Sequence, residues 1–241
     1  MKISVILPTY NESENITALS QELLTVLKSQ GITGEVVIVD DNSPDGTGNI
    51  ADALSERDNR VKVVHRPAKL GLATAIDEGS KAASHEIIVT MDSDFSHPPR
   101  IVPELVSALD EVDISIGSRY VKGGSMEGPI HKIILSRMMT TFAGWLLGLN
   151  VKDCTGGFHA LRKNLLQELE VKSKGGEYDL ELLYKAKERG YTMKEIPFTY
   201  KYREKGESKT NLLKGGTIYL LTAMRLVLES SSETTSDTYK E

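Results

Sequence analysis

Residues 86–94 read EIIVTMDSD, and the order of apolar and polar residues in this stretch predicts the kind of sheet that the chain forms. The run at 86–91 has no alternating polar positions, which is typical of a strand buried on both faces of a parallel sheet. Further strand-like runs lie at 3–7, 35–40, 61–65 and 113–117. Because segments with helical spacing separate these runs, the sequence predicts βαβ units. The expected fold is α/β: an open, mostly parallel twisted sheet with helices on both faces.

The second half of the chain has longer helical patterns. Residues 129–149 predict a long helix with a broad apolar face, and residues 211–229 predict an amphipathic helix. Between them we expect a glycine-containing segment at 153–162, a helix at 177–189, a strand at 192–199 and a charged loop at 200–210. We expect residues 1–229 to form a single domain and the polar tail at 230–241 to be disordered.

Composition excludes several classes of protein. The chain has 241 residues and a net charge of -5, which argues against a general nucleic-acid binder because such proteins neutralise phosphates with Lys and Arg. Cys154 is the only cysteine, so an internal disulfide is impossible and a reducing compartment fits. The apolar run after Met1 is too short for a signal peptide. Arg225 interrupts the longest apolar stretch, 217–228, so we expect no transmembrane helix.

Two carboxylates follow the strand at 86–91. Asp92 and Asp94 are two residues apart at a predicted strand end, where they could share one hard cation such as Mg²⁺ or Mn²⁺. A cation held there would neutralise the charge that develops on a departing nucleoside diphosphate. A solvated acidic turn is the alternative, but ligands of open α/β sheets bind beyond the carboxyl ends of the strands. The position therefore favours a metal site.

Two other strand ends carry polar residues. The segment VDDNSPDGT at 39–47 can present a carboxylate to a ribose or a base, although it also has the composition of a turn with a helix cap at Thr47. After the first strand, Tyr10 could stack on a base and Glu12 could hydrogen-bond to it. The alternative is that Pro8 and Asn11 simply end the strand and bind no ligand. The chain has neither a G-x-G-x-x-G after the first strand nor a P-loop, which argues against a dinucleotide-dependent dehydrogenase and a P-loop NTPase.

Taken together, the segments resemble those of family-2 glycosyltransferases, and within that family the dolichol-phosphate mannose synthases. The resemblance covers residues 1 to about 210, and the order and spacing of the motifs are more specific than any one of them. The motifs are LPTYNE at 7–12, VDDNSPDGT at 39–47, KLGLATA at 69–75, MDSDFSHPP at 91–99, GSRYVKGG at 117–124, DCTGGFHALRK at 153–163 and GESK at 206–209.

The resemblance implies a GT-A-like fold with a nucleotide-binding half at 1–120 and an acceptor-binding half with interfacial helices at 121–229. It implies inverting transfer of mannose from GDP-mannose to dolichyl or polyprenyl phosphate, with Mg²⁺ or Mn²⁺ as cofactor. Partners would be the nucleotide-sugar donor, the lipid acceptor, a membrane surface and membrane-anchoring subunits, but no nucleic acid. The protein would act peripherally at the cytoplasmic face of a membrane.

The resemblance also assigns roles to residues. Asp92, Asp94 and Arg119 would be catalytic, and Asp94, Ser96 and Asp92 would bind the metal. Arg119 would reach the donor or the acceptor phosphate. The substrate-binding residues would be Pro8, Tyr10, Glu12, Val39, Asp41, Asp92, Ser93, Asp94 and Arg119, with Arg203 and Lys209 closing over the donor.

Two departures from the family pattern stand in the sequence. Ser93 replaces a frequent alanine, and His159 stands where an arginine is common, which puts a phosphate contact from position 159 in doubt. The sequence leaves two other activities open. One is a polyprenyl-phosphate glucosyltransferase that uses UDP-glucose, and the other is a non-catalytic module that binds nucleotide sugars.

Overall fold

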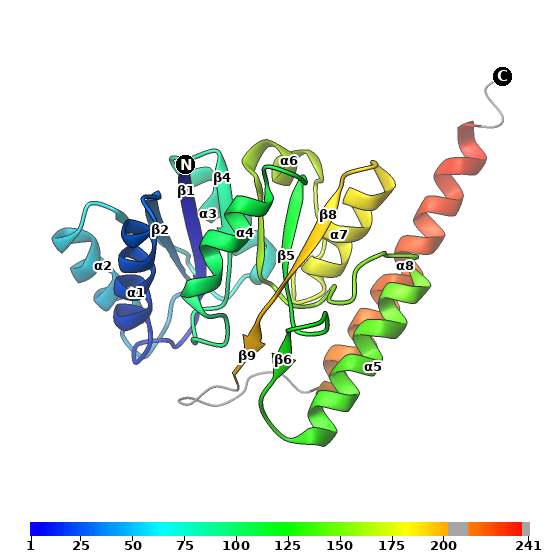
Figure 1. The fold of residues 1–241 in the computed structure, drawn as a ribbon, viewed down its shortest axis with the longest axis horizontal. Coiled ribbons are helices and arrows are strands. Elements are labelled where there is room, and N and C mark those ends of the chain that lie inside the picture. The colour runs from blue at the N-terminus through cyan, green and yellow to red at the C-terminus, as the bar shows by residue number, and fades with distance from the viewer. Residues whose placement is uncertain (202–211, 238–241) are drawn as a thin grey trace.

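The computed structural model describes residues 1–201 and 212–237, and its centre is a seven-stranded sheet (Figure 1). The strand order is β3-β2-β1-β4-β7-β5-β8, and only β7 runs antiparallel to its neighbours. This arrangement confirms the predicted open, mostly parallel α/β sheet. The strands are β1 Lys2–Thr9, β2 Thr33–Asp40, β3 Val61–His65, β4 Ile87–Thr90, β5 Ile114–Ser118, β7 His159–Arg162 and β8 Met193–Pro197.

Helices cover both faces of the sheet. On one face α1 (Ile16–Ser29), α2 (Thr47–Arg57) and α4 (Val102–Ala108, after a 3-10 turn at Pro99–Ile101) form one apolar core with the strands. The second core holds residues of α3 (Leu72–Ala82), α5 (Ile130–Leu146), α6 (Lys163–Glu168), α7 (Tyr178–Glu188) and α8 (Leu212–Asp237). A separate two-stranded sheet pairs β6 (Ser125–Met126) with β9 (Thr199–Tyr200).

Strand β1 shows why the short apolar runs form central strands. Successive side chains of a strand point to opposite faces, so Val5 and Leu7 enter the core under α1 while Ile6 enters the other core. All three side chains are fully buried. A strand in this position needs apolar residues at every position, and the sequence supplies them.

Two features differ from the expectations. Strand β7 lies within the glycine-containing segment predicted at 153–162, and it fills the space between β4 and β5 with hydrogen bonds on both sides. Because β7 and β8 complete the sheet, the two halves predicted to meet near residue 120 share one sheet. Helix α8 continues to Asp237, so residues 230–237 are helical where composition predicts a disordered tail.

Helices α5 and α8 lie side by side at one edge of the molecule (Figure 1). Both expose large apolar side chains, which we call the apolar helix face. None of the helices in the described part of the chain is long and apolar enough to cross a membrane. The apolar helix face consists of Ile130, Ile134, Met138, Phe142 and Trp145 of α5 and Ile218, Leu220, Leu221, Met224 and Leu228 of α8.

Candidate active site at the carboxyl ends of the strands

The loops that follow β1, β2 and β4 meet at one edge of the sheet, because these three strands are parallel neighbours. Each loop contains a residue other than glycine in the left-handed conformation: Asn11 has φ 58°, Asn42 φ 55° and Phe95 φ 64°. Asparagine tolerates this conformation, but a bulky residue such as phenylalanine rarely adopts it. Such strained residues cluster at functional sites. The backbone therefore marks the same edge of the sheet as the polar residues do.

The predicted metal-binding residues form one compact turn after β4. Asp94 is buried, and its Oδ1 accepts hydrogen bonds from the Ser96 backbone N–H at 3.0 Å and from Ser96 Oγ at 2.5 Å. Ser93 Oγ donates to the carbonyl of Pro8 at 2.9 Å, which ties this turn to the end of β1. The Asp92 side chain is 45% exposed. The turn thus presents one carboxylate to solvent and holds the other in a fixed orientation.

The residues of this turn fit a Mg²⁺ or Mn²⁺ ion that also binds a phosphate. Across residues 1–201 and 212–237, no three His, Cys, Asp or Glu side chains come together to hold a metal. Mg²⁺ keeps several waters and binds through one or two carboxylates plus substrate phosphates. Asp92 and Asp94, with the Ser96 hydroxyl, supply that smaller set.

Asp41 is held by a buried arginine that the sequence analysis missed. Arg66 follows β3 directly, and its Nη1 donates to Asp41 Oδ1 and to the Gly71 carbonyl, while its Nη2 donates to Thr74. Burial raises the pKa of Asp41, and the nearby Arg66 charge partly opposes that rise. A polar residue directly after a strand is the signal that could have identified Arg66. This contact connects the loops after β2 and β3 at the expected nucleoside end of the site.

The other residues expected to hold the nucleoside differ in what they can offer. Lys69 Nζ lies 4.2 Å from the centre of the Tyr10 ring, so a cation already covers one ring face. Glu12 is buried, and its Oε2 accepts from Asn15 Nδ2 at 2.9 Å. The Val39 side chain is fully buried in the core, so only its backbone is available for a ligand. The pyrrolidine of Pro8 is half-buried beside them.

Arg119 is buried against Asp153. Its backbone N–H and Nε donate to Asp153 Oδ2 at 2.9 and 2.8 Å, and its Nη2 donates to Oδ1 at 2.7 Å. Burial alone would lower the pKa of Arg119, but the attraction of Asp153 outweighs burial and raises it. Glu195 on β8 accepts the Asp153 N–H at 3.0 Å and the Ser118 hydroxyl at 2.7 Å. The sequence motif around Asp153 thus positions Arg119, a role that residue type alone did not reveal.

Arg119 has a second cation beside it. The Cζ atoms of Arg119 and Arg137 lie 5.0 and 5.9 Å from the centre of the Tyr120 ring, and the Tyr120 hydroxyl is 2.9 Å from Ser136 Oγ. Arg137 is exposed and belongs to α5, the helix that carries half of the apolar helix face. A basic region therefore lies where the site meets that helix. Arg203 and Lys209, expected to close over the donor, lie outside the described residues.

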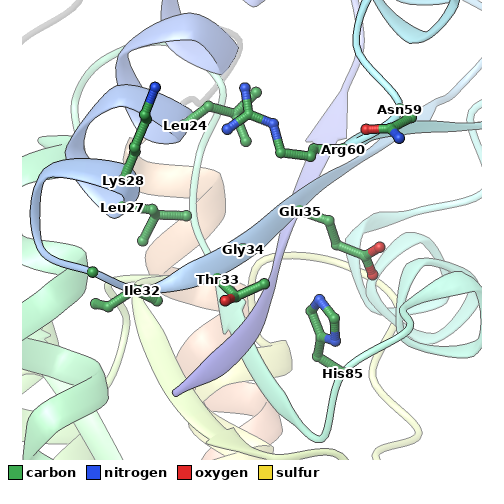
Figure 2. Close-up of a pocket in the computed structure, with 11 residues that line it drawn as sticks. Leu24, Leu27, Lys28, Ile32, Thr33, Gly34, Glu35, Asn59, Arg60 and His85 are labelled. Atoms are coloured by element: carbon green, nitrogen blue, oxygen red, sulfur yellow. The ribbon is translucent and has the colours of Figure 1, made fainter.

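A pocket of about 490 Å³ lies at the opposite end of the sheet (Figure 2). Its lining includes Thr33, Gly34 and Glu35 at the start of β2, together with Lys28 and His85. Strand starts are the wrong end of an open α/β sheet for a substrate. The predicted aspartates do not line this pocket. We therefore assign the candidate site to the carboxyl edge on chemistry and topology rather than on pocket size.

The sheet order and the acidic turn after β4 define a GT-A type of glycosyltransferase fold. A solved structure shares this fold: glucosyl-3-phosphoglycerate synthase from Mycobacterium tuberculosis, in complex with Mn²⁺, UDP and glucosyl-3-phosphoglycerate. The TM-score is 0.70 at 22% sequence identity, over 95% of this chain and 79% of that one. The chain belongs to glycosyl transferase family 2, whose model matches residues 4–170.

Two curated relatives are more similar in sequence. A dolichol-phosphate mannosyltransferase from Pyrococcus furiosus is 41% identical over 223 residues, which are 91% of this chain and 61% of the relative. A polyprenol monophosphomannose synthase from Mycolicibacterium smegmatis is 37% identical over 214 residues, 85% of this chain and 79% of that protein. The chain thus spans about six tenths of the length of the Pyrococcus protein.

Proposed function

We propose that this protein transfers mannose from GDP-mannose to dolichyl phosphate or another polyprenyl phosphate, with inversion at the sugar and with Mg²⁺ or Mn²⁺ bound. The observation that carries the proposal is the turn after β4, where Ser96 orients the buried Asp94 beside the half-exposed Asp92. The names of the two curated relatives support mannose as the sugar and a polyprenyl phosphate as the acceptor.

The acceptor supplies its own nucleophile in this reaction. A phosphate monoester has a second pKa near 6 and carries roughly -1.5 to -2 charges at neutral pH. A general base is then unnecessary, unlike in transfer to a hydroxyl group. The protein must instead bring two anionic groups together and hold them in line. This requirement explains why cationic side chains gather at the site of a chain whose net charge is -5.

The chain's own residues divide this work. Tyr10, Glu12 and Asp41 hold the nucleoside, and Asp92, Asp94 and Ser96 hold the cation. When bound, the cation supplies charge neutralisation for the departing GDP. Arg119, with Asp153 fixing its guanidinium, and Arg137 give the acceptor phosphate its positive surroundings. Arginine suits that role because its planar fork can bind a phosphate with two hydrogen bonds.

The apolar helix face supports a peripheral position on a membrane. A polyprenyl tail stays in the bilayer, so the protein has to meet its acceptor at the interface. The exposed large apolar residues of α5 recur every three or four positions along the helix, and Trp145 near its end is 72% exposed. Helices with such a face lie in the interfacial plane of membranes. Arg137 would then stand close to the lipid head groups, where the acceptor phosphate lies.

A transfer assay tests the activity. GDP-mannose and UDP-glucose, each with a radiolabelled sugar, are incubated with dolichyl phosphate or shorter polyprenyl phosphates, with Mg²⁺, Mn²⁺ or a chelator. We expect label from GDP-mannose to enter the lipid only when a divalent cation is present. Transfer from UDP-glucose alone would identify a polyprenyl-phosphate glucosyltransferase. Nucleotide-sugar binding without a lipid product from either donor would refute the proposal and indicate a binding module.

Two further measurements test its parts. NMR of the lipid-linked sugar should show the inverted anomer, and a retained anomer would contradict the single displacement. Trp145 is the only tryptophan, so its fluorescence reports directly on the apolar helix face. We expect a blue shift with phospholipid vesicles and a loss of vesicle flotation for the double variant Ile134→Gln, Met138→Gln. The variant Ser107→Gln on α4, also an exposed site, should float as the unmodified protein does.

A further inference from the structure

His97 is a fully buried residue to which the proposed mechanism gives no role. Its ring stacks on Phe158 with the ring centres 4.8 Å apart and the planes 7° from parallel. The edges of Phe198 and Tyr200 pack around it at centre distances of 5.6 and 6.2 Å. Three rings, one from the segment leading into β7 and two from the segment that runs from the end of β8 into β9, thus fix its orientation.

The Nδ1 atom of this ring accepts a hydrogen bond from the backbone N–H of Asp92 at 2.9 Å. An accepting Nδ1 places the proton of the neutral ring on Nε2. Nε2 lies 3.9 Å from Asp92 Oδ2, so the ring faces both the backbone and the carboxylate of that aspartate.

This hydrogen bond closes the turn that carries the two aspartates. Within the turn, Phe95 adopts the left-handed conformation, which is unfavourable for a bulky residue and persists only where neighbouring contacts hold it. Those contacts include the bonds from Ser96 to Asp94, the bond from Ser93 to Pro8, and the bond from Asp92 to His97. His97 anchors the turn at Asp92, the first of the two aspartates.

We infer that His97 is a positioning residue that holds the turn at 92–96 in the shape that binds a divalent cation together with a nucleoside diphosphate. The inference rests on the proposed function of that turn. His97 touches neither the sugar nor the phosphates in this scheme, and it acts through Asp92. Hydrogen-bond partners of this kind that orient metal ligands typically change metal affinity by 10–100-fold when they are lost.

Two substitutions separate the hydrogen bond from the packing of the ring. His97→Phe keeps an aromatic ring against Phe158 but has no acceptor for the Asp92 N–H. His97→Asn loses the ring but can place its amide oxygen where Nδ1 stands. His159→Phe is the matched control, because His159 is equally buried and faces Asp179, with its Nδ1 3.5 Å from Asp179 Oδ1.

The test measures Mn²⁺ affinity in the presence of GDP by electron paramagnetic resonance, and thermal unfolding without ligands. We expect His97→Phe to weaken Mn²⁺ binding by about 10–100-fold. His97→Asn should stay within about threefold of the unmodified protein although it unfolds at a lower temperature, and His159→Phe should bind Mn²⁺ normally. If His97→Phe does not fold, His97→Met replaces it, since methionine fills irregular apolar space and accepts hydrogen bonds only weakly.

Three outcomes would overturn the inference. One is unchanged Mn²⁺ affinity in the folded His97→Phe protein. Another is a loss of affinity that follows the unfolding temperature across all three variants, which would indicate a purely structural role. The last is an equal loss in His159→Phe. These results differ from failure of the proposed function, in which the unmodified protein itself would bind no Mn²⁺ with GDP.

Discussion

The loops at the two ends of the central sheet are built in different ways. At the amino ends of the strands, Gly31 takes the left-handed position before β2 at no steric cost, and Glu35 accepts ordinary hydrogen bonds from Ser4 and Ser84. At the carboxyl ends, Asn11, Asn42 and Phe95 take left-handed positions that glycine would adopt more easily. Among the described residues, Glu170 after α6 also takes this conformation, but it belongs to none of these three loops. We call the amino ends, where the pocket of Figure 2 lies, the relaxed end, and the carboxyl ends the strained end. Strain and polar chemistry therefore locate the site better than the shape of the surface does.

The sharpest test of this comparison removes one charge at the strained end. Asp94→Asn keeps the size of the side chain but removes the carboxylate that Ser96 orients. We expect mannosyl transfer to fall by at least about 10³-fold, because the variant loses charged binding of the cation that stabilises the leaving group. The assay is label transfer from GDP-mannose at saturating Mn²⁺. Asp58→Asn, near the relaxed end, should transfer normally, and full activity of Asp94→Asn would contradict the site assignment.

The second prediction concerns stability at the same end. Asp153→Ala leaves the buried Arg119 without its partner, and breaking a buried pair in this way costs about 3–5 kcal/mol. Denaturant unfolding measures the loss. The surface pair of Lys194 and Glu111, at 2.6 Å, provides the comparison, because Lys194→Ala should cost less than about 1 kcal/mol. Equal losses in the two variants would mean that Arg119 is not held as the structure indicates.

The third prediction extends the comparison to the helix that borders the site. Glu181 on α7 is buried, and it accepts hydrogen bonds from Ser173 and from Arg225 of α8. Burial alone would raise its pKa, but the hydrogen bonds outweigh burial and lower the pKa to about 2 from a usual value of 4.5. Because the folded-state pKa is the lower one, the stabilisation is complete above pH 4.5 and is lost as the pH falls toward 2.

We therefore expect Glu181→Gln to lower the free energy of unfolding by about 2 kcal/mol at pH 6 and to reduce its dependence on pH between 4.5 and 2. Denaturant unfolding at a series of pH values measures both effects. Glu188→Gln, an exposed change on the same helix, should leave the pH dependence as it is. An unchanged pH profile for Glu181→Gln would show that this carboxylate does not tie α8 to α7.

The smallest effect is expected at the pocket of Figure 2. Lys28→Ala and His85→Ala change two side chains of its lining, at the amino ends of the strands. Transfer rate and donor KM should both stay within about twofold of the unmodified protein, since surface changes away from a site rarely exceed about 0.5 kcal/mol. A rise in donor KM would instead assign the nucleotide to this pocket and reverse the comparison between the two ends.

The sequence predicted most strands well because the central ones are continuous apolar runs. Both faces of the sheet are apolar, so a central strand needs apolar side chains at successive positions. Strand β1 has them at Val5, Ile6 and Leu7, and this run can be recognised in the sequence alone. β7 was missed because its residues follow two glycines and show no comparable apolar run. It becomes a strand because β4 and β5 offer hydrogen-bonding edges on both of its sides.

The sequence by itself determined the parallel sheet, the edge at which polar loops gather and the pair of aspartates after β4, because each depends on neighbouring residues in the chain. Only the tertiary structure decided which distant residues support that pair. Arg66 reaches Asp41, Asp153 fixes Arg119, and His97 lies against Phe158. Such pairings depend on how segments far apart in sequence come together, and the type and spacing of a residue do not reveal its partner.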